Sequence, residues 1–161
     1  MQWFRKAADQ GDANAQGNLG EMYAYGLGVP KDEQQAVQWF RKAADQGHVT
    51  AQHVLGFMYR EGRGVSKDEQ LAAQWYRKAA DQGDADGQLG LGLMYYEGRG
   101  VPKDEQHAYF WFLLSSARGN ESSAKARDFV EGKLTAKQRV DAQVEARSWK
   151  PKTPTDIGSR R

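Results

Sequence analysis

The chain has 161 residues, of which 39% are hydrophobic, and its formal net charge is +2. Its length suits one domain, it contains no cysteine, and no apolar run approaches the roughly 20 residues that span a bilayer. These features exclude a disulfide framework, thiolate chemistry and a transmembrane segment, and they predict a soluble protein that is cytoplasmic, or exported if an upstream signal was removed.

The predicted elements follow a repeat of 36 residues. Two residue types mark it most clearly, namely Trp3, Trp39, Trp75 and Trp111, and Gly11, Gly47, Gly83 and Gly119. Residues 3–38 and 39–74 are identical at 24 of 36 positions. Because each copy must then occupy nearly the same local environment, the pattern predicts an array of stacked units.

The array is predicted to begin with a partial repeat, residues 1–11, which matches only the second helix of a unit. Three full repeats follow at 12–47, 48–83 and 84–119. A partial unit leaves one face without a neighbour, and this exposed edge makes a homodimer conceivable.

Each full repeat is predicted to contain two helices. In the first, helix A covers about 13–25, with Asp12 as N-cap and Gly26 as the left-handed C-terminal cap. After a short loop, helix B covers about 32–46 and stops at Gly47. The short connections require antiparallel neighbours.

Helix B carries one apolar face. Ala36, Trp39, Phe40 and Ala43 recur at helical spacing, opposite polar residues such as Arg41. The tryptophans that repeat every 36 residues are therefore predicted to lie in the core.

The C-terminal part, 120–149, is predicted to be a degenerate repeat followed by a capping helix at 135–149. Thr135 is the expected N-cap, and Ala136, Val140 and Val144 are expected to form a narrow apolar seam. Residues 150–161 are basic, include two prolines and lack periodicity, so a disordered tail is expected there.

The recurring residues resemble the Sel1-like repeat of the tetratricopeptide-like, often bacterial, families. In the first unit the resemblance rests on Ala15, Leu19, Gly20, Tyr23, Gly26, Gly28, Val29, Asp32, Ala36, Trp39, Ala43, Ala44 and Gly47. It implies an all-α fold, an α-α solenoid that winds as a right-handed superhelix of about nine helices. It also implies an adaptor or scaffold in protein complexes.

Differences between the repeats predict where a partner binds. Of the 12 positions at which the first two units differ, nine lie in or beside helix A: 12, 13, 14, 17, 18, 21, 24, 25 and 27. Most of them fall along one side of that helix. A side without repeated residues does not pack against the repeat. The resemblance to tetratricopeptide-like superhelices implies that helix A lines the concave surface, so this side is expected to form that surface.

The predicted concave surface binds a protein or peptide through residues of helix A in successive units. They are Asn14, Glu21, Thr50, His53, Phe57, Arg60, Asp86, Leu89, Leu93, Tyr96, Lys125 and Phe129. Exposed apolar residues with a polar rim are typical of interaction sites. The alternative is that strong curvature buries Phe57, Leu93 and Phe129 against each other as ordinary core.

Other functions receive less support. Residues 125–161 hold ten Lys or Arg against five Asp or Glu, so they could tether the chain to an acidic surface such as nucleic acid or the cell envelope. Nucleic-acid binding is nevertheless not expected. A hydrolase would need a convergent polar pocket, and the three histidines stand in no metal-binding or catalytic pattern. No catalytic residue, metal or cofactor is predicted.

Overall fold

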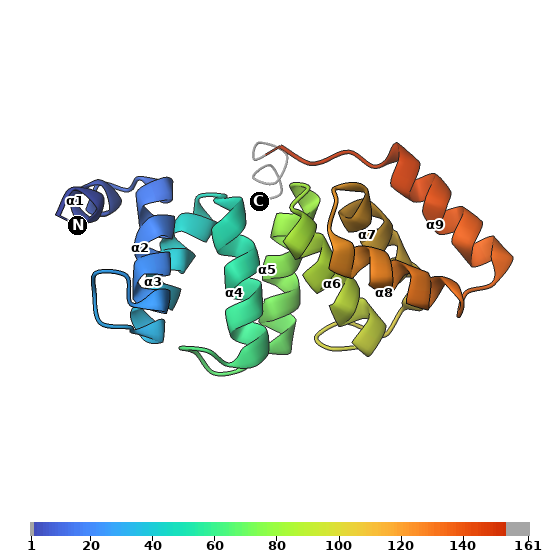
Figure 1. Ribbon diagram of the computed structural model, residues 1–161, viewed down its shortest axis with the longest axis horizontal. Coiled ribbons are helices and arrows are strands. Elements are labelled where there is room, and N and C mark those ends of the chain that lie inside the picture. The colour runs from blue at the N-terminus through green and yellow to red at the C-terminus, as the bar shows by residue number, and fades with distance from the viewer. Residues whose placement is uncertain (1, 154–161) are drawn as a thin grey trace.

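The computed structural model describes residues 2–153, and within that range the chain is all helical, with no strand. The described part of the chain contains nine helices in succession (Figure 1): α1 Gln2–Asp9, α2 Ala13–Tyr25, α3 Glu33–Asp45, α4 Val49–Glu61, α5 Glu69–Asp81, α6 Ala85–Glu97, α7 Glu105–Ala117, α8 Glu121–Glu131 and α9 Ala136–Ser148. The predicted helix pairs, their number and the solenoid class are confirmed.

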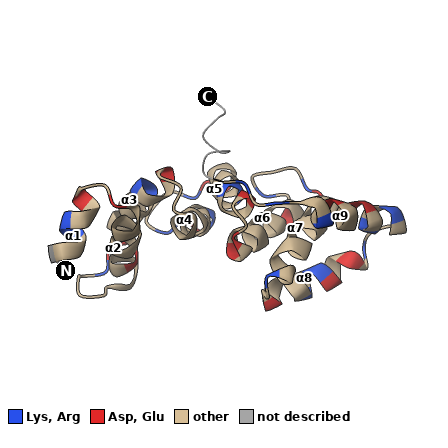
Figure 2. Cartoon of the chain, turned by 90° about the horizontal axis from the view of Figure 1, so that it is seen from above, with Lys and Arg blue, Asp and Glu red and all other residues tan. Residues whose placement is uncertain are grey.

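The helices form two rows. Helices α2, α4, α6 and α8 are the A helices and lie in the front row of Figure 1, with α3, α5 and α7 behind them. Helices α2, α4 and α6 each pack against the B helix of their own repeat and against that of the preceding one, whereas α8 packs mainly against α7. Seen from above, α2 and α8 lie further forward than α4 and α6 (Figure 2), so the front side curves inward across the middle of the array.

Side-chain caps define where the helices begin. The carboxylate of Asp12 accepts a hydrogen bond from the backbone N–H of Ala15, which is otherwise unsatisfied at a helix N-terminus. His48 takes the same place before α4, where its Nδ1 accepts from Ala51 N. Gly26 closes α2 at φ 70°, in the left-handed region that glycine adopts without strain. The predicted helix boundaries follow from these caps.

The core runs between the two rows, and the later tryptophans lie in it as predicted. Trp39, Trp75 and Trp111 are at most 8% exposed. Trp3 contradicts the prediction, because it is 83% exposed. Among the described helices α1 packs mainly on α2, whereas the other three tryptophans belong to helices with neighbours on both sides.

Buried glutamines connect consecutive units. Gln16 and Gln52 each donate from Nε2 to a backbone carbonyl of the preceding B helix. Their side-chain oxygens accept hydrogen bonds from Gln46 and Gln82, both at 2.7 Å. These amides satisfy one another inside the interface, as buried polar groups require.

Helix α9 caps the array on the side of α7. Thr135 is the N-cap, as predicted, and it forms a capping box with Gln138. The predicted apolar seam is wrong, because Val140 and Val144 are exposed, and the buried residue is Ala142. The helix is turned so that Ala142 and, partly buried, Ala146 pack on the core instead of the two valines.

The chain after α9 returns along the array as an extended segment (Figure 1). The ring of Trp149 meets that of Trp111 edge to face at 6.4 Å. Lys152 then donates its backbone N–H to Asp81 O and pairs its Nζ with the Asp81 carboxylate, each at 2.7 Å. The first residues of the expected disordered tail, 150–153, therefore follow the surface of the array, and residues 154–161 lie outside the described residues.

Candidate functional site

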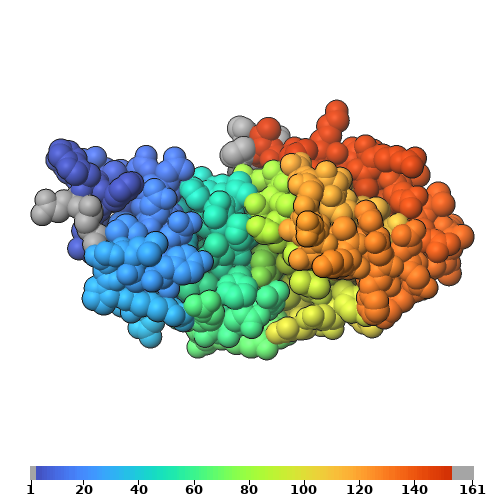
Figure 3. All heavy atoms as spheres, viewed as in Figure 1, coloured from blue at the N-terminus to red at the C-terminus, as the bar shows by residue number. Residues whose placement is uncertain are grey.

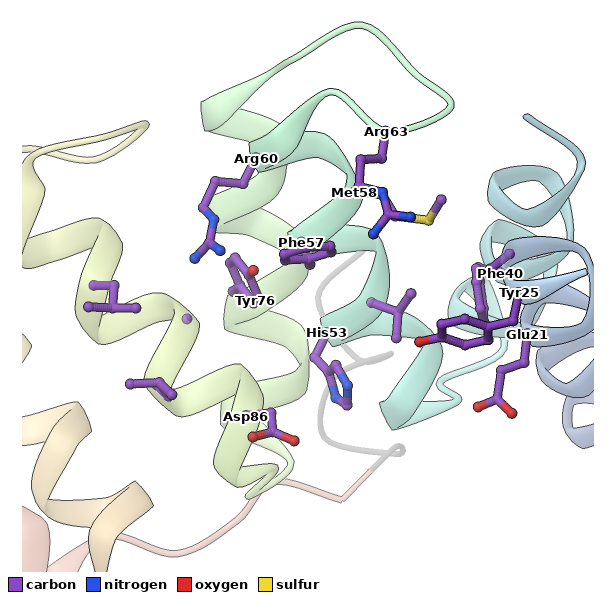
Figure 4. A pocket seen from close by; sticks show the side chains of 15 residues that line it. Glu21, Tyr25, Phe40, His53, Phe57, Met58, Arg60, Arg63, Tyr76 and Asp86 are labelled. Atoms are coloured by element: carbon purple, nitrogen blue, oxygen red, sulfur yellow. The ribbon is translucent and has the colours of Figure 1, made fainter. Parts of the chain in front are cut away.

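A hollow of about 370 Å³ opens on the inward-curving side of the array. Its walls come from α2, α4 and α6, which are the A helices of three consecutive repeats, and from α3 and α5 beneath them. Figure 3 shows this face of the molecule, and Figure 4 shows the lining side chains. The hollow exists only because the repeats stack.

The floor of the hollow is apolar and aromatic. Phe57 stands on α4 in the centre, with 37% of its surface exposed. Leu89 and Leu93 line the α6 side and are half-buried against the main core. Tyr76 reaches the floor from α5, and its burial raises the pKa of its phenol to about 12. Such a floor provides apolar surface for a partner to cover.

Charged side chains surround this floor. The guanidinium of Arg60 lies 5.5 Å from the centroid of the Phe57 ring and 5.9 Å from that of Tyr76, within cation–π range. Glu21 and Asp86 line the hollow on the other side of Phe57, where His53 contacts Asp84 at 2.8 Å. The site therefore combines apolar surface with both signs of charge.

A second arginine reaches the hollow from the loop after α4. Arg63 lies 5.7 Å from the Phe57 ring centroid and donates Nε and Nη2 hydrogen bonds to Glu33 Oε1. This hydrogen bonding, with a further contribution from Lys31, holds the pKa of the Glu33 carboxyl below its ordinary value. The arginine thus links two repeats at the rim of the site.

The 36-residue repeat of this chain matches that of a known protein family. The model of the Sel1 repeat matches residues 1–12, 13–48, 49–84 and 85–120, which is most of the chain. The chain belongs to the Sel1 repeat family. Proteins of this family typically serve as scaffolds for protein–protein interaction. No match to a curated protein was found.

Solved Sel1 repeat structures share the fold. A crystal structure of a protective antigen present in uropathogenic Escherichia coli strains, displaying an SLR fold, is 45% identical with TM-score 0.84, and the match covers 92% of this chain and 32% of that one. This chain therefore spans about a third of the antigen's length. A Sel1 repeat protein from Oxalobacter formigenes is 40% identical with TM-score 0.73, over 79% and 96% of the two chains. Helicobacter pylori cysteine rich protein B is 31% identical with TM-score 0.59, over 76% and 92%.

The Sel1 array brings together seven of the twelve residues that the repeat comparison singled out. Around the hollow lie Glu21, His53, Phe57, Arg60, Asp86, Leu89 and Leu93. Asn14 lies instead in a shallow hollow with Trp3 and Phe4 at the N-terminal edge. Thr50 and Lys125 are exposed and line neither hollow.

Tyr96 and Phe129 form a separate aromatic contact between α6 and α8. Their rings meet edge to face at 6.0 Å. Lys133 lies over both rings and donates a hydrogen bond to Tyr96 Oη at 2.7 Å, which raises the pKa of that lysine. Phe129 is nonetheless 60% exposed, so the inward-curving side carries a second apolar patch beside the hollow.

Several lining residues were not among the predicted ones. Val54 and Arg63 lie 36 residues after Asn18 and Leu27, so each pair occupies equivalent positions, or one column, of successive repeats. The repeats differ in both columns, so the comparison of repeats could have identified Val54 and Arg63 as well. Phe40 and Tyr76 carried no such signal, because they belong to the repeated core of helix B. Their rings reach the hollow because Gly20 and Gly56 on helix A leave room for Phe40 and Tyr76, respectively.

Charges elsewhere on the described chain are mostly mixed (Figure 2). In the C-terminal part, Arg127 pairs with Asp128 and Lys137 pairs with Asp141. Within residues 2–153 no helix has the length and apolar character of a membrane span, and no group of three or more His, Asp or Glu side chains is placed to hold a metal ion. The hollow is therefore the best-defined site.

Proposed function

We propose that this Sel1 array is an interaction module that binds a peptide or an exposed segment of a partner protein in the hollow on its inward-curving side. The observation that carries the proposal is the exposed ring of Phe57 in the centre of a hollow built by three repeats. Burying such a ring beneath a ligand removes apolar area from water, at roughly 25 cal/mol per Å². Aromatic residues beside arginine are also the common anchors of protein interfaces.

The variation between repeats supports the same surface. Phe57 occupies the column of Glu21 and Leu93, so three units place three different side chains at one structural position. Packing within the repeat does not require a particular residue there. Selection for a ligand that contacts several repeats at once accounts for residues that differ in this way.

The test is binding to a displayed peptide library by the intact chain and by the Phe57→Ser variant. Phe57 is partly exposed, so its replacement is expected to shift the melting temperature by no more than a few degrees while most of the selected binding is lost. Phe129→Ser is the matched control, because that ring is more exposed and lies outside the hollow. Equal binding by Phe57→Ser and the intact chain would place the site elsewhere.

A further inference from the structure

The two ends of the hollow carry opposite charge. His53, Phe57 and Arg60 follow one another on successive turns of α4, so they mark a line along the floor (Figure 4). Arg60 stands at one end of that line, and Glu21 and Asp86 flank the other end. With a helical rise of about 1.5 Å per residue, the distance from His53 to Arg60 along the helix axis is about 10 Å.

The acidic end has no cation of its own. Among the described residues, Glu21 forms no ion pair, and Asp86 has only a hydrogen bond at 3.1 Å from the amide of Asn120. The His53 ring beside them already contacts the Asp84 carboxylate. Two carboxylates are therefore available to a cationic side chain that enters this end.

At the other end of the hollow, Arg60 has hydrogen-bond donors that no other described residue uses. Arg60 uses its Nε for Glu61 at 2.7 Å, and the Glu61 side chain is 43% exposed. The two terminal nitrogens of Arg60 form no hydrogen bond with another described residue. A planar guanidinium held over an aromatic floor can present these nitrogens to a carboxylate.

The volume of the hollow limits how much of a ligand it can enclose. The hollow has about 370 Å³ and is open on the side that faces solvent. It can therefore enclose a bulky side chain and part of the adjacent backbone, while the rest of the ligand stays at the surface.

From this arrangement we infer the chemistry of the ligand, on the basis of the function proposed above. The hollow selects an extended peptide in which a bulky apolar residue lies between a cationic residue and an acidic residue, each two positions away. In an extended chain, residues two apart point to the same side and lie about 7 Å from each other. The apolar side chain then covers Phe57, the cation meets Glu21 or Asp86, and the carboxylate meets Arg60.

The inference is tested with blocked synthetic peptides and the intact chain at low salt. The peptides are Lys-Gly-Phe-Gly-Glu, its reverse Glu-Gly-Phe-Gly-Lys, and the like-charged Glu-Gly-Phe-Gly-Glu and Lys-Gly-Phe-Gly-Lys. One of the two mixed-charge peptides is expected to bind at least about fivefold more tightly than either like-charged peptide. The preference is expected to shrink as salt screens the exposed charges.

Charge reversal in the protein gives the decisive comparison. The double variant Glu21→Lys, Asp86→Lys is expected to prefer the peptide with two glutamates. Glu121→Lys is the control, because this exposed residue lies outside the hollow. Equal binding of all four peptides, unchanged by charge reversal but lost in Phe57→Ser, overturns the charge inference and leaves the proposed function intact. Binding that survives Phe57→Ser, or no binding by any peptide, overturns both.

Discussion

Gly56 lies against the ring of Tyr76 so closely that a Cβ atom at Gly56 would be 2.7 Å from Cδ1 of the tyrosine. The same relationship joins Gly20 to Phe40 in the preceding unit, at 2.6 Å. Helix A thus approaches helix B within a repeat because a glycine stands where the aromatic ring must pass. This approach also sets the depth of the hollow, since Tyr76 forms part of its floor.

Replacing Gly56 by alanine is expected to destabilise the array in spite of alanine's better helix propensity. The propensity gain is about 1 kcal/mol, and the clash with a fully packed ring costs about 1–3 kcal/mol. A net loss of roughly 1 kcal/mol in the free energy of unfolding is expected in urea titrations. The loss should largely disappear in a Tyr76→Leu background; the same loss in both backgrounds would show that the ring is not the cause.

The fold could be predicted from the sequence because each repeat packs in the same way, so the residues that recur every 36 positions mark the packed positions. Asp12 and Gly26 could be assigned as caps, since capping depends on the few residues around each helix end. Trp3 and Val140 were assigned wrongly for a different reason. Their burial depends on which helix lies beside them and on how that helix is turned, and local periodicity carries neither.

The stability of the array is expected to fall in alkali because of Tyr76. Its pKa is about 12 in the folded chain, against about 10 for the exposed phenol, so between these values the folded state holds a proton that the unfolded state loses. The contribution is present below pH 10 and is lost as the pH rises toward 12. About 1 kcal/mol of unfolding free energy should be lost between pH 9 and pH 11.

Tyr76→Phe is the matched variant for this measurement, because the equivalent positions in the neighbouring units are Phe40 and Phe112. The variant should be as stable as the parent at pH 7 and show a flatter decline above pH 9. Absorbance titration at 295 nm should also lose its latest-ionising tyrosine. An unchanged titration curve would mean that another tyrosine is the protected one.

The glutamine connection between units is broken at the third repeat, where Arg118 stands in the column of Gln46 and Gln82. Gln88 is fully buried, and its Oε1 accepts no hydrogen bond within residues 2–153. A Cβ atom at Gly83 would lie 2.7 Å from Arg118 Nη2, so the guanidinium is directed there instead. Arg118→Gln is expected to supply the missing donor and to raise the unfolding free energy by about 1 kcal/mol.

Gln82→Ala is the reverse experiment, because it deprives Gln52 Oε1 of its donor. An unsatisfied buried acceptor costs about 1–3 kcal/mol, so this variant should unfold at lower urea concentration. A gain from Arg118→Gln together with a loss from Gln82→Ala would establish the connection as stabilising. A loss from both variants would show that the arginine contributes more through its contacts near Gly83.

The site was predictable only where the repeats differ. The repeats differ at the positions equivalent to Glu21 and Asn18, and unlike residues at equivalent positions cannot all serve the same packing. These differences therefore predicted a binding surface on α2, α4 and α6. The comparison of repeats could not identify Tyr76, because an aromatic residue at a repeated position is expected in the core whether or not it also lines the hollow. The separation of Phe129 from the hollow also required coordinates, because it depends on how far α8 stands forward of α6.

The segment after α9 is expected to depend on Trp149. Its ring packs edge to face on Trp111. Three residues later, the backbone N–H of Lys152 donates a hydrogen bond to Asp81 O. Aromatic pairs of this geometry contribute about 0.5–1.5 kcal/mol beyond the apolar area that they bury, whereas an exposed ion pair such as that of Lys152 Nζ contributes at most about 1 kcal/mol.

Trp149→Ala should therefore increase hydrogen exchange at the Lys152 amide and throughout α9, while Lys152→Ala should leave the exchange of α9 nearly unchanged. If α9 exchanges equally in the parent and in Trp149→Ala, its docking rests on Ala142 and the neighbouring contacts with α7 instead.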